Sequence, residues 1–339
     1  MDTPTAFSAF RWRRISFYVL AFFVSVHFAF SYLTLTFPMV PLGPYLQLQT
    51  RTPFRYRVFP VLIHDGYQFV LDHLHVQFPA LNPPVNTPDN WFMSLLAIAS
   101  MFTALVFTAR TIVHVTGRRE YRWLAFALAL IGYFNYTLVL NRNQFYPYDI
   151  PMVAAFAGLT YFAVTRNYLL FALWFIPSMV TKETATFGIL LFFLLNVRRE
   201  QWRAVTAYCA ALGLVAMAIK YVLYRTLYQP CPECVVLAES HLLANLTQFA
   251  NPLFWISFAS TFAYLWIVLL CVWRLADERL RRAFAILFAV WFAVLLKTTI
   301  MRELRLFGDM SPFFVVVLAS GVGAWLDGRR GGGEQAVIS

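Results

Sequence analysis

The chain has 339 residues, of which 60% are apolar and only 13% are charged. Soluble domains average roughly one half apolar and one quarter charged residues, so this composition excludes an ordinary soluble protein. The formal net charge is +11, but Arg-rich loops on one face of a membrane protein explain that excess without a nucleic-acid partner. The sequence predicts an all-α polytopic membrane protein with a single integral membrane domain over residues 1–339.

The N-terminal segment combines a basic start with a long apolar run. It reads "FRWRRISFYVLAFFVSVHFAFSYLTLTF", which is too long for the apolar core of a signal peptide and is not followed by a small-residue cleavage site. We therefore expect an uncleaved first span at residues 15–37.

A long segment, residues 38–90, follows this first span and forms the predicted first outer loop. Its middle, "RVFPVLIHDGYQFVLDHLHVQF", has apolar residues at helical spacing with polar residues between them, which is typical of a helix lying in the membrane interface. The following "PALNPPVNTPDN" is rich in Pro and Asn and predicts an irregular connection.

Hydropathy predicts about ten spans in total. After residues 15–37 they fall at 91–115, 123–140, 149–165, 168–181, 184–197, 204–228, 253–273, 283–301 and 311–326. The fifth and sixth are short for a hydrocarbon layer of roughly 30 Å, so we expect them to be tilted or partly re-entrant.

The positions of basic clusters agree with this threading. "RWRR" precedes the first span, and "TGRREYR", "VRREQWR", "RLADERLRR" and "DGRR" each follow an even-numbered span. Ten spans place all of these clusters on one face, which the positive-inside rule assigns to the cytoplasm. We expect a bacterial inner-membrane protein with both termini in the cytoplasm and a disordered tail at 327–339.

The same threading places several charged segments on the outer face. "TKET" lies between the two short spans and contributes Lys182 and Glu183. One interpretation is an interfacial pair whose side chains reach water. The other is a pocket between helices, in which Glu183 acts as a general base or metal ligand and Lys182 holds a phosphate.

The segment "NRNQFYPYD" forms the turn before the fourth span. Its Asn, Gln and Tyr side chains, Tyr148 among them, suit the recognition of a sugar, and Arg142 and Asp149 bracket the turn. The alternative is a polar turn with interfacial aromatic residues, in which the acid caps the following helix.

The segment "RELRLFGD" lies at the outer end of the ninth span. Arg302 and Arg305 share a helix face by their i,i+3 spacing, and two guanidiniums form a fork for phosphate or pyrophosphate oxygens. The alternative is a solvated turn in which the arginines pair with Glu303 and Asp309.

Two further outer segments carry candidate residues. "RTPFRYR" contributes Arg55 and Arg57, either to contact lipid phosphates or to grip a lipid-linked pyrophosphate. "CPEC" contributes Cys231 and Cys234, for which an oxidising compartment favours a structural disulfide. A redox-active pair is the alternative for this motif.

About ten spans, an interfacial helix in the first outer loop and charged outer segments together resemble the GT-C class of membrane glycosyltransferases. "FRYRVFP", "YPYDIP", "KET" and "RELRLFGD" look like patterns in bacterial members of that group. The resemblance implies a GT-C-like fold and transfer of a sugar from a polyprenyl-phosphate carrier to a glycan or lipid acceptor. It also implies an acid early in the first outer loop. Residues 38–64 contain none, and Asp65 is the first candidate.

The mechanism implied by this resemblance uses Glu183 or Asp149 to deprotonate an acceptor hydroxyl, while Arg302, Arg305 and Lys182 stabilise the leaving phosphate. A divalent metal can assist such chemistry, although the sequence has no diagnostic ligand spacing. The alternative functions are a lipid-linked glycan polymerase or ligase, a flippase or transporter, and a thiol–disulfide oxidoreductase built on "CPEC".

Overall fold

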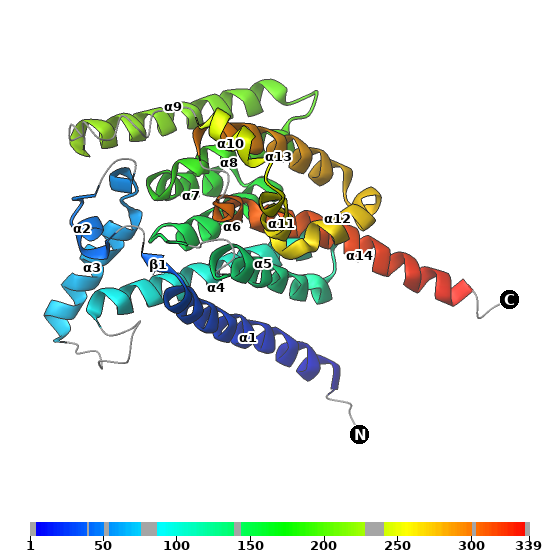
Figure 1. The fold of residues 1–339 in the computed structure, drawn as a ribbon. Helices are drawn as coiled ribbons and strands as arrows, with labels where there is room; N and C mark the ends of the chain where they lie inside the picture. The colour runs from blue at the N-terminus through cyan, green and yellow to red at the C-terminus, as the bar shows by residue number, and fades with distance from the viewer. Residues whose placement is uncertain are drawn as a thin grey trace.

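The structure is a computed structural model that describes residues 5–38, 41–50, 54–75, 87–138, 144–227, 241–299 and 303–335. Within these ranges the regular elements are helices, apart from one pair of two-residue strands (Figure 1). The all-helical class predicted from the sequence is therefore confirmed.

The elements follow one another along the chain in three parts. The first part comprises α1 (Thr5–Leu35), β1 (Phe37–Pro38), α2 (Leu42–Leu46), η1 (Phe54–Tyr56), α3 (Phe59–Leu74), α4 (Pro88–Thr116), η2 (Arg119–Ala125), α5 (Phe126–Tyr136) and β2 (Gln144–Phe145). The middle comprises α6 (Asp149–Val164), α7 (Tyr168–Thr181), η4 (Glu183–Thr186), α8 (Phe187–Asn196) and α9 (Trp202–Leu227). The last part comprises α10 (Leu242–Gln248), α11 (Pro252–Ser260), η6 (Thr261–Tyr264), α12 (Leu265–Val272), η7 (Trp273–Leu275), α13 (Glu278–Thr298), η8 (Leu304–Met310) and α14 (Ser311–Gln335).

Five helical segments of the described chain are long and apolar enough to cross a membrane. They are Ile15–Leu35, Pro88–Thr116, Trp202–Leu227, Pro252–Leu275 and Arg305–Gly328. Helices α6, α7 and α8 are apolar but shorter. Helix α5 has 11 residues, which corresponds to only about 16 Å. Each predicted span thus overlaps a helix, while five of them meet the length and hydropathy expected of a spanning helix.

The centre of the bundle is α6, which packs against α4, α7, α8 and α14. All but one of its residues are buried, as expected for a helix that is apolar on every side. Ala154 and Gly158 form a small-xxx-small pair that permits close helix approach. A Cβ on Gly158 would lie 2.2 Å from Nε1 of Trp174, and that indole donates a hydrogen bond to the Ala155 carbonyl at 2.9 Å.

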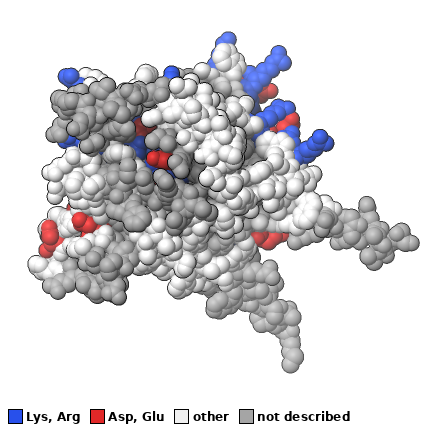
Figure 2. Space-filling view, in the orientation of Figure 1, with Lys and Arg blue, Asp and Glu red and all other residues white. Residues whose placement is uncertain are grey.

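The basic clusters of the sequence gather at one end of the bundle. Arg118 pairs with Asp327 at 3.7 Å, which joins the ends of α4 and α14. The backbone N–H of Asp277 donates to Ser320 Oγ, and this bond places the start of α13 beside α14. Lys and Arg are prominent where α9 and α13 begin, on the right in the view (Figures 1 and 2). We call this region, residues 117–122, 198–203, 274–282 and 323–328, the Arg-rich end.

Helix α3 occupies the place of the predicted interfacial helix. One of its faces exposes Leu62, Phe69 and Leu74, with exposed fractions of 60–68%. The opposite face holds His64, which pairs with Asp89 of α4 at 3.1 Å. A helix that exposes several large apolar side chains together with charged ones is suited to lie along a membrane surface.

The C-terminal helix differs from the prediction. Helix α14 continues to Gln335, past residue 327, where the sequence predicted the start of a disordered tail.

Candidate functional site

Asp149 is placed by the turn that precedes α6. Strand β1 pairs in parallel with β2, and the Tyr32 hydroxyl of α1 accepts a hydrogen bond from the Tyr146 N–H at 3.2 Å. These contacts hold the turn against α1 and direct Asp149 into the bundle, where it is completely buried. Its carboxylate binds cations from other segments, so the prediction that it serves merely as a helix cap does not describe its contacts.

The backbone between α7 and α8 separates the two charges of "TKET". Lys182 ends α7 with extended dihedral angles, φ −163° and ψ 147°. Glu183 then begins η4, so the extended backbone at Lys182 breaks the helical course between the two charges. Lys182 is accordingly directed inward and is 2% exposed, whereas the side chain of Glu183 is 39% exposed. The Lys182 side chain therefore does not reach water, which rules out the interpretation of an interfacial lysine.

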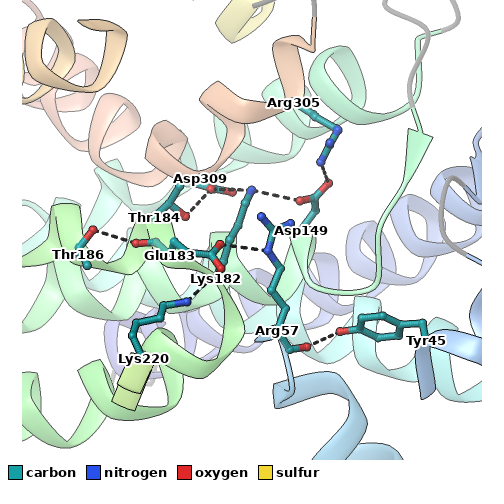
Figure 3. Close-up of polar contacts among 10 residues, drawn as sticks. All are labelled: Tyr45, Arg57, Asp149, Lys182, Glu183, Thr184, Thr186, Lys220, Arg305 and Asp309. Atoms are coloured by element: carbon teal, nitrogen blue, oxygen red, sulfur yellow. Dashed lines mark hydrogen bonds and ion pairs between the residues drawn. The ribbon is translucent and has the colours of Figure 1, made fainter. Parts of the chain in front are cut away.

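Four buried charged side chains form a continuous network. Lys182 Nζ lies 3.2 Å from Asp149 Oδ1 and 2.8 Å from Asp309 Oδ2. Arg305 Nη1 lies 2.8 Å from the second oxygen of Asp149. Figure 3 shows these side chains converging from α6, the α7–α8 turn and η8. We call Asp149, Lys182, Arg305 and Asp309 the buried ion network. Its two anions and two cations balance, which is the condition under which charges persist in a protein interior.

A second group of charges lies at the more exposed edge of this network. Arg57 Nε is 3.1 Å from Glu183 Oε2, and Lys220 Nζ is 3.0 Å from Glu183 Oε1 (Figure 3). The exposed fractions of the Arg57 and Lys220 side chains are 13% and 30%. We call Glu183, Arg57 and Lys220 the Glu183 group. It carries one excess positive charge and is open to solvent or ligand.

Aromatic rings support the two arginines. The Arg57 guanidinium lies 4.2 Å from the ring centroid of Tyr148, and that of Arg305 lies 3.7 Å from the ring centroid of Tyr146. Both distances are in the range of favourable cation–π contacts. The Tyr45 hydroxyl also donates to the Arg57 carbonyl at 2.5 Å. The guanidiniums are therefore held in fixed orientations.

The Glu183 group perturbs the acidity of its members. Burial alone would raise the pKa of Glu183, but Arg57 and Lys220 outweigh it and lower the pKa to about 2. Burial alone would lower the pKa of Arg57, but Glu183 and Tyr148 raise it above its usual value. Glu183 is therefore an anion, and Arg57 a cation, over the whole physiological pH range.

Several polar atoms beside these charges are buried and have no hydrogen-bond partner among the described residues. They are Asp309 Oδ1, Arg305 Nε and the Tyr148 hydroxyl. Buried polar atoms are normally paired, so this part of the site retains capacity to bind water or a polar ligand.

The structure brings residues of four predicted outer segments together. Asp149, Lys182 and Arg305 belong to the buried ion network, and Glu183 and Arg57 to the Glu183 group. Glu303 binds Arg305 Nη2 at 2.5 Å, and Tyr148 packs against Arg57. Arg305 nevertheless lies on η8 and not on α13, which corrects the prediction that it shares a helix face at the end of the ninth span.

The physical cause of that difference is an early end to α13. Thr299 adopts extended dihedral angles, φ −137° and ψ 169°. The Asn245 side chain then donates to the carbonyls of Leu296 and Thr299, at 2.8 and 2.6 Å. The last carbonyls of α13 are satisfied without a further helical turn.

Other predicted residues lie apart from the site or outside the described chain. Asp65 is exposed on α3, and among the described residues no hydrogen bond or ion pair joins it to either charged group. Arg55 is half-buried in η1, and its Nε has no hydrogen-bond partner among the described residues. The remaining predicted residues, Arg142, Arg302, Cys231 and Cys234, lie outside the described ranges.

Two members of the site were not among the residues singled out from the sequence for a role. Asp309 was considered there only as a partner for nearby arginines, yet it binds Lys182 and accepts a hydrogen bond from Thr184 at 2.8 Å. Lys220 binds Glu183 from the C-terminal third of α9. The rarity of lysine was the available signal, because the chain has Lys only at 182, 220 and 297.

The residues present offer little to a metal ion. Among the described residues, no group of three or more His, Cys, Asp or Glu side chains is arranged to hold one. The Lys182 ammonium lies between the carboxylates of Asp149 and Asp309, in the position that a cation would take.

Comparisons of this chain with protein-family models, with curated proteins and with solved structures found no match. Its function must therefore be inferred from the geometry of the site.

Proposed function

We propose that this chain is a GT-C-like membrane glycosyltransferase that transfers a sugar from a polyprenyl-phosphate carrier to a glycan or lipid acceptor. The observation that carries the proposal is the Glu183 group. It combines a partly exposed carboxylate with two cations, and it is anchored on a buried ion network assembled from distant segments. An acidic group beside phosphate-binding cations is the minimum equipment for this reaction.

Glu183 is the best candidate for the general base. Its side chain is 39% exposed, whereas Asp149 is fully buried with both oxygens bound by cations. A base must be within reach of the acceptor hydroxyl. We assign Asp149 the role of positioning Lys182 and Arg305. While Arg57 and Lys220 pair with Glu183, its low pKa makes it a weak base. Transfer of these two cations to a bound phosphate would strengthen it.

The proposed reaction is a single displacement at the anomeric carbon. Glu183 accepts the proton of the acceptor hydroxyl, whose oxygen forms the new glycosidic bond as the bond between the anomeric carbon and the phosphate oxygen breaks. The leaving polyprenyl phosphate takes up the bonding electron pair. Arg57 and Lys220, the more exposed cations of the site, are placed to stabilise that charge.

Access for a lipid carrier is supported by the elements around the Glu183 group. Arg57 lies in the two-residue connection between η1 and α3, and Lys220 belongs to α9. Helix α3 exposes an apolar face, and α9 exposes Leu214, Met217 and Val222 at 55–64%. A carrier whose chain lies in the bilayer would reach the cations along these apolar surfaces.

We also propose the finer topology predicted from the sequence, with ten spans and both termini on the cytoplasmic side of a bacterial inner membrane. It is supported by the separation of the Arg-rich end from the buried ion network. Among the described residues, ion pairs lie near one end of the bundle or the other. This arrangement favours chemistry on one side of the membrane over a flippase, which requires polar sites near the membrane midplane.

The test is sugar transfer by proteoliposomes that contain the full chain and a panel of radiolabelled polyprenyl-phosphate hexoses. We expect Glu183→Gln to lower the rate by about 10²–10⁴-fold, the usual contribution of a general base. Lys220→Met should raise the KM for the donor, because it removes a phosphate contact.

A matched control is Glu278→Gln, which makes the same change at an exposed helix terminus of the Arg-rich end. It should leave transfer unchanged. Undiminished transfer by folded Glu183→Gln protein would overturn the assignment of the base. Movement of the lipid-linked donor across the bilayer without sugar transfer would indicate a flippase instead of a glycosyltransferase.

A further inference from the structure

A cavity lies at the Arg-rich end, apart from the buried ion network and the Glu183 group. It has a volume of about 450 Å³ and is bounded by α1, α4, η2 and α6. Its polar wall consists of Arg110, His114, Arg119 and Arg122, and its apolar wall includes Phe17 and Val106. The cavity thus offers both basic groups for an anion and apolar surface for a hydrocarbon chain.

The basic wall follows from helical spacing. Val106, Arg110 and His114 are each four residues apart on α4, so they form one stripe that passes from apolar to basic. The backbone of η2 adds Arg122, whose Nε donates to the Arg119 carbonyl at 2.8 Å. This bond uses Nε and leaves the two terminal guanidinium nitrogens of Arg122 to line the cavity.

The depth of Arg110 is informative. It lies six residues before Thr116, where α4 ends, which is about 9 Å along the helix axis. It is therefore within a segment long and apolar enough to span the membrane. Helix α4 has 29 residues, about 43 Å, which exceeds the roughly 30 Å of hydrocarbon, so Arg110 lies near the membrane boundary, at the level of lipid headgroups.

The charge balance also distinguishes this cavity. Its lining contains no Asp or Glu among the described residues. The carboxylate of Asp327, which lies nearby on α14, is bound by Arg118 and by the Tyr121 hydroxyl.

We propose that this cavity binds an anionic phospholipid, with the headgroup phosphate on Arg110 and Arg122 and an acyl chain against Phe17 and Val106. Guanidiniums bind phosphate oxygens with directed, charge-assisted hydrogen bonds. Basic pockets between membrane helices are known to suit anionic headgroups. The site is separate from the proposed active site and would anchor this end of the protein to its membrane.

The experiment uses the full chain in detergent, titrated separately with phosphatidylglycerol, phosphatidylcholine and inorganic phosphate, with bound lipid counted by native mass spectrometry. We expect phosphatidylglycerol to bind in preference to phosphatidylcholine, and inorganic phosphate to compete weakly. Arg110→Gln with Arg122→Gln should reduce phosphatidylglycerol affinity by about tenfold or more, because two charged hydrogen-bonding groups are lost.

The matched control is Arg203→Gln with Arg274→Gln, which removes the same charge from exposed positions outside the cavity. It should bind lipid as the parent does. A second check is Val106→Trp, which fills the apolar part of the cavity and should weaken lipid binding while leaving the direct binding of inorganic phosphate unchanged.

Three results would overturn the proposal. The first is equal loss of affinity in the cavity and control variants, which would mean that only the net charge matters. The second is equal binding of phosphatidylcholine and phosphatidylglycerol. The third is inorganic phosphate binding as tightly as phosphatidylglycerol, which would assign the cavity to a free anion.

Discussion

The two ends of this molecule use the same kinds of charged residue in opposite ways. In the buried ion network, Lys182 and Arg305 are 2% and 7% exposed, and each binds a carboxylate. At the Arg-rich end, Arg118 is 51% exposed, and its pair with Asp327 has a separation of 3.7 Å. Removal of one partner from the buried ion network leaves an unpaired charge away from water, so both partners of each pair are required. At the Arg-rich end, water can take the place of a lost partner.

The buried ion network depends on exact contacts between particular side chains, whereas the exposed arginines serve only to orient the protein in the membrane. Exposed arginines need only be on the correct face of the membrane, because they act by their charge. Buried lysines and arginines must also meet their counterions at hydrogen-bond distance. The contrast makes unequal predictions for similar substitutions at the two ends.

The largest expected effect follows the removal of the Asp149 carboxylate. Asp149→Leu leaves Arg305 buried with only Glu303, and leaves Lys182 with only Asp309. We expect destabilisation of about 3–5 kcal/mol, typical of one missing partner in a buried pair. The measurement is thermal unfolding in detergent. Glu278→Leu, at an exposed pair, should cost about 1 kcal/mol or less. Equal losses in the two variants would contradict the contrast between the ends.

A somewhat smaller effect is expected from Gly308→Ala in η8, between Arg305 and Asp309. An added Cβ would lie 2.0 Å from the Tyr136 hydroxyl oxygen, and overpacking of this kind costs roughly 1–3 kcal/mol. Adding Tyr136→Phe should restore part of the loss in thermal unfolding. The control is Gly213→Ala in α9, where a Cβ meets nothing within 4 Å. Helix propensity predicts that this control gains up to about 1 kcal/mol.

The Glu183 group predicts a pH dependence of stability. The folded-state pKa of Glu183 is lowered from 4.5 to about 2, so its contribution is present above pH 4.5 and is lost as the pH falls toward 2. The effect should be modest, because the side chain is 39% exposed and solvent screens the interaction. Unfolding midpoints of the parent and Glu183→Gln should therefore converge on acidification. A constant difference across that range would refute the linkage.

The smallest expected effect concerns the exposed pair at the Arg-rich end. Arg118→Gln removes a partner of Asp327 whose side chain is 36% exposed, and the Tyr121 hydroxyl still binds that carboxylate at 2.8 Å. We expect less than about 1 kcal/mol of destabilisation, decreasing further at high salt. Unfolding midpoints at low and high ionic strength provide the measurement. A large, salt-independent loss would show that this pair is structural after all.

Much of the fold follows from local sequence patterns. Long apolar runs predict helices, and the structure has a helix at each predicted span. Even the short fifth span, 168–181, coincides with α7 (Tyr168–Thr181). These features depend on neighbours within a few turns, which is why hydropathy detects them. The end of α13 was missed because its last carbonyls are satisfied by Asn245, a residue about fifty positions earlier.

The sequence by itself determined the helical class, the approximate helix positions and the separation of basic clusters from the charged segments of the site. Only the tertiary structure decided which charges meet. It joined Arg57 to Glu183 across 126 residues and Asp149 to Arg305 across 156, and it left Asp65 exposed on α3. The physical reason is that hydropathy depends on the local composition of a helix. An ion pair depends on how two helices are rotated and packed, which distant parts of the chain determine together.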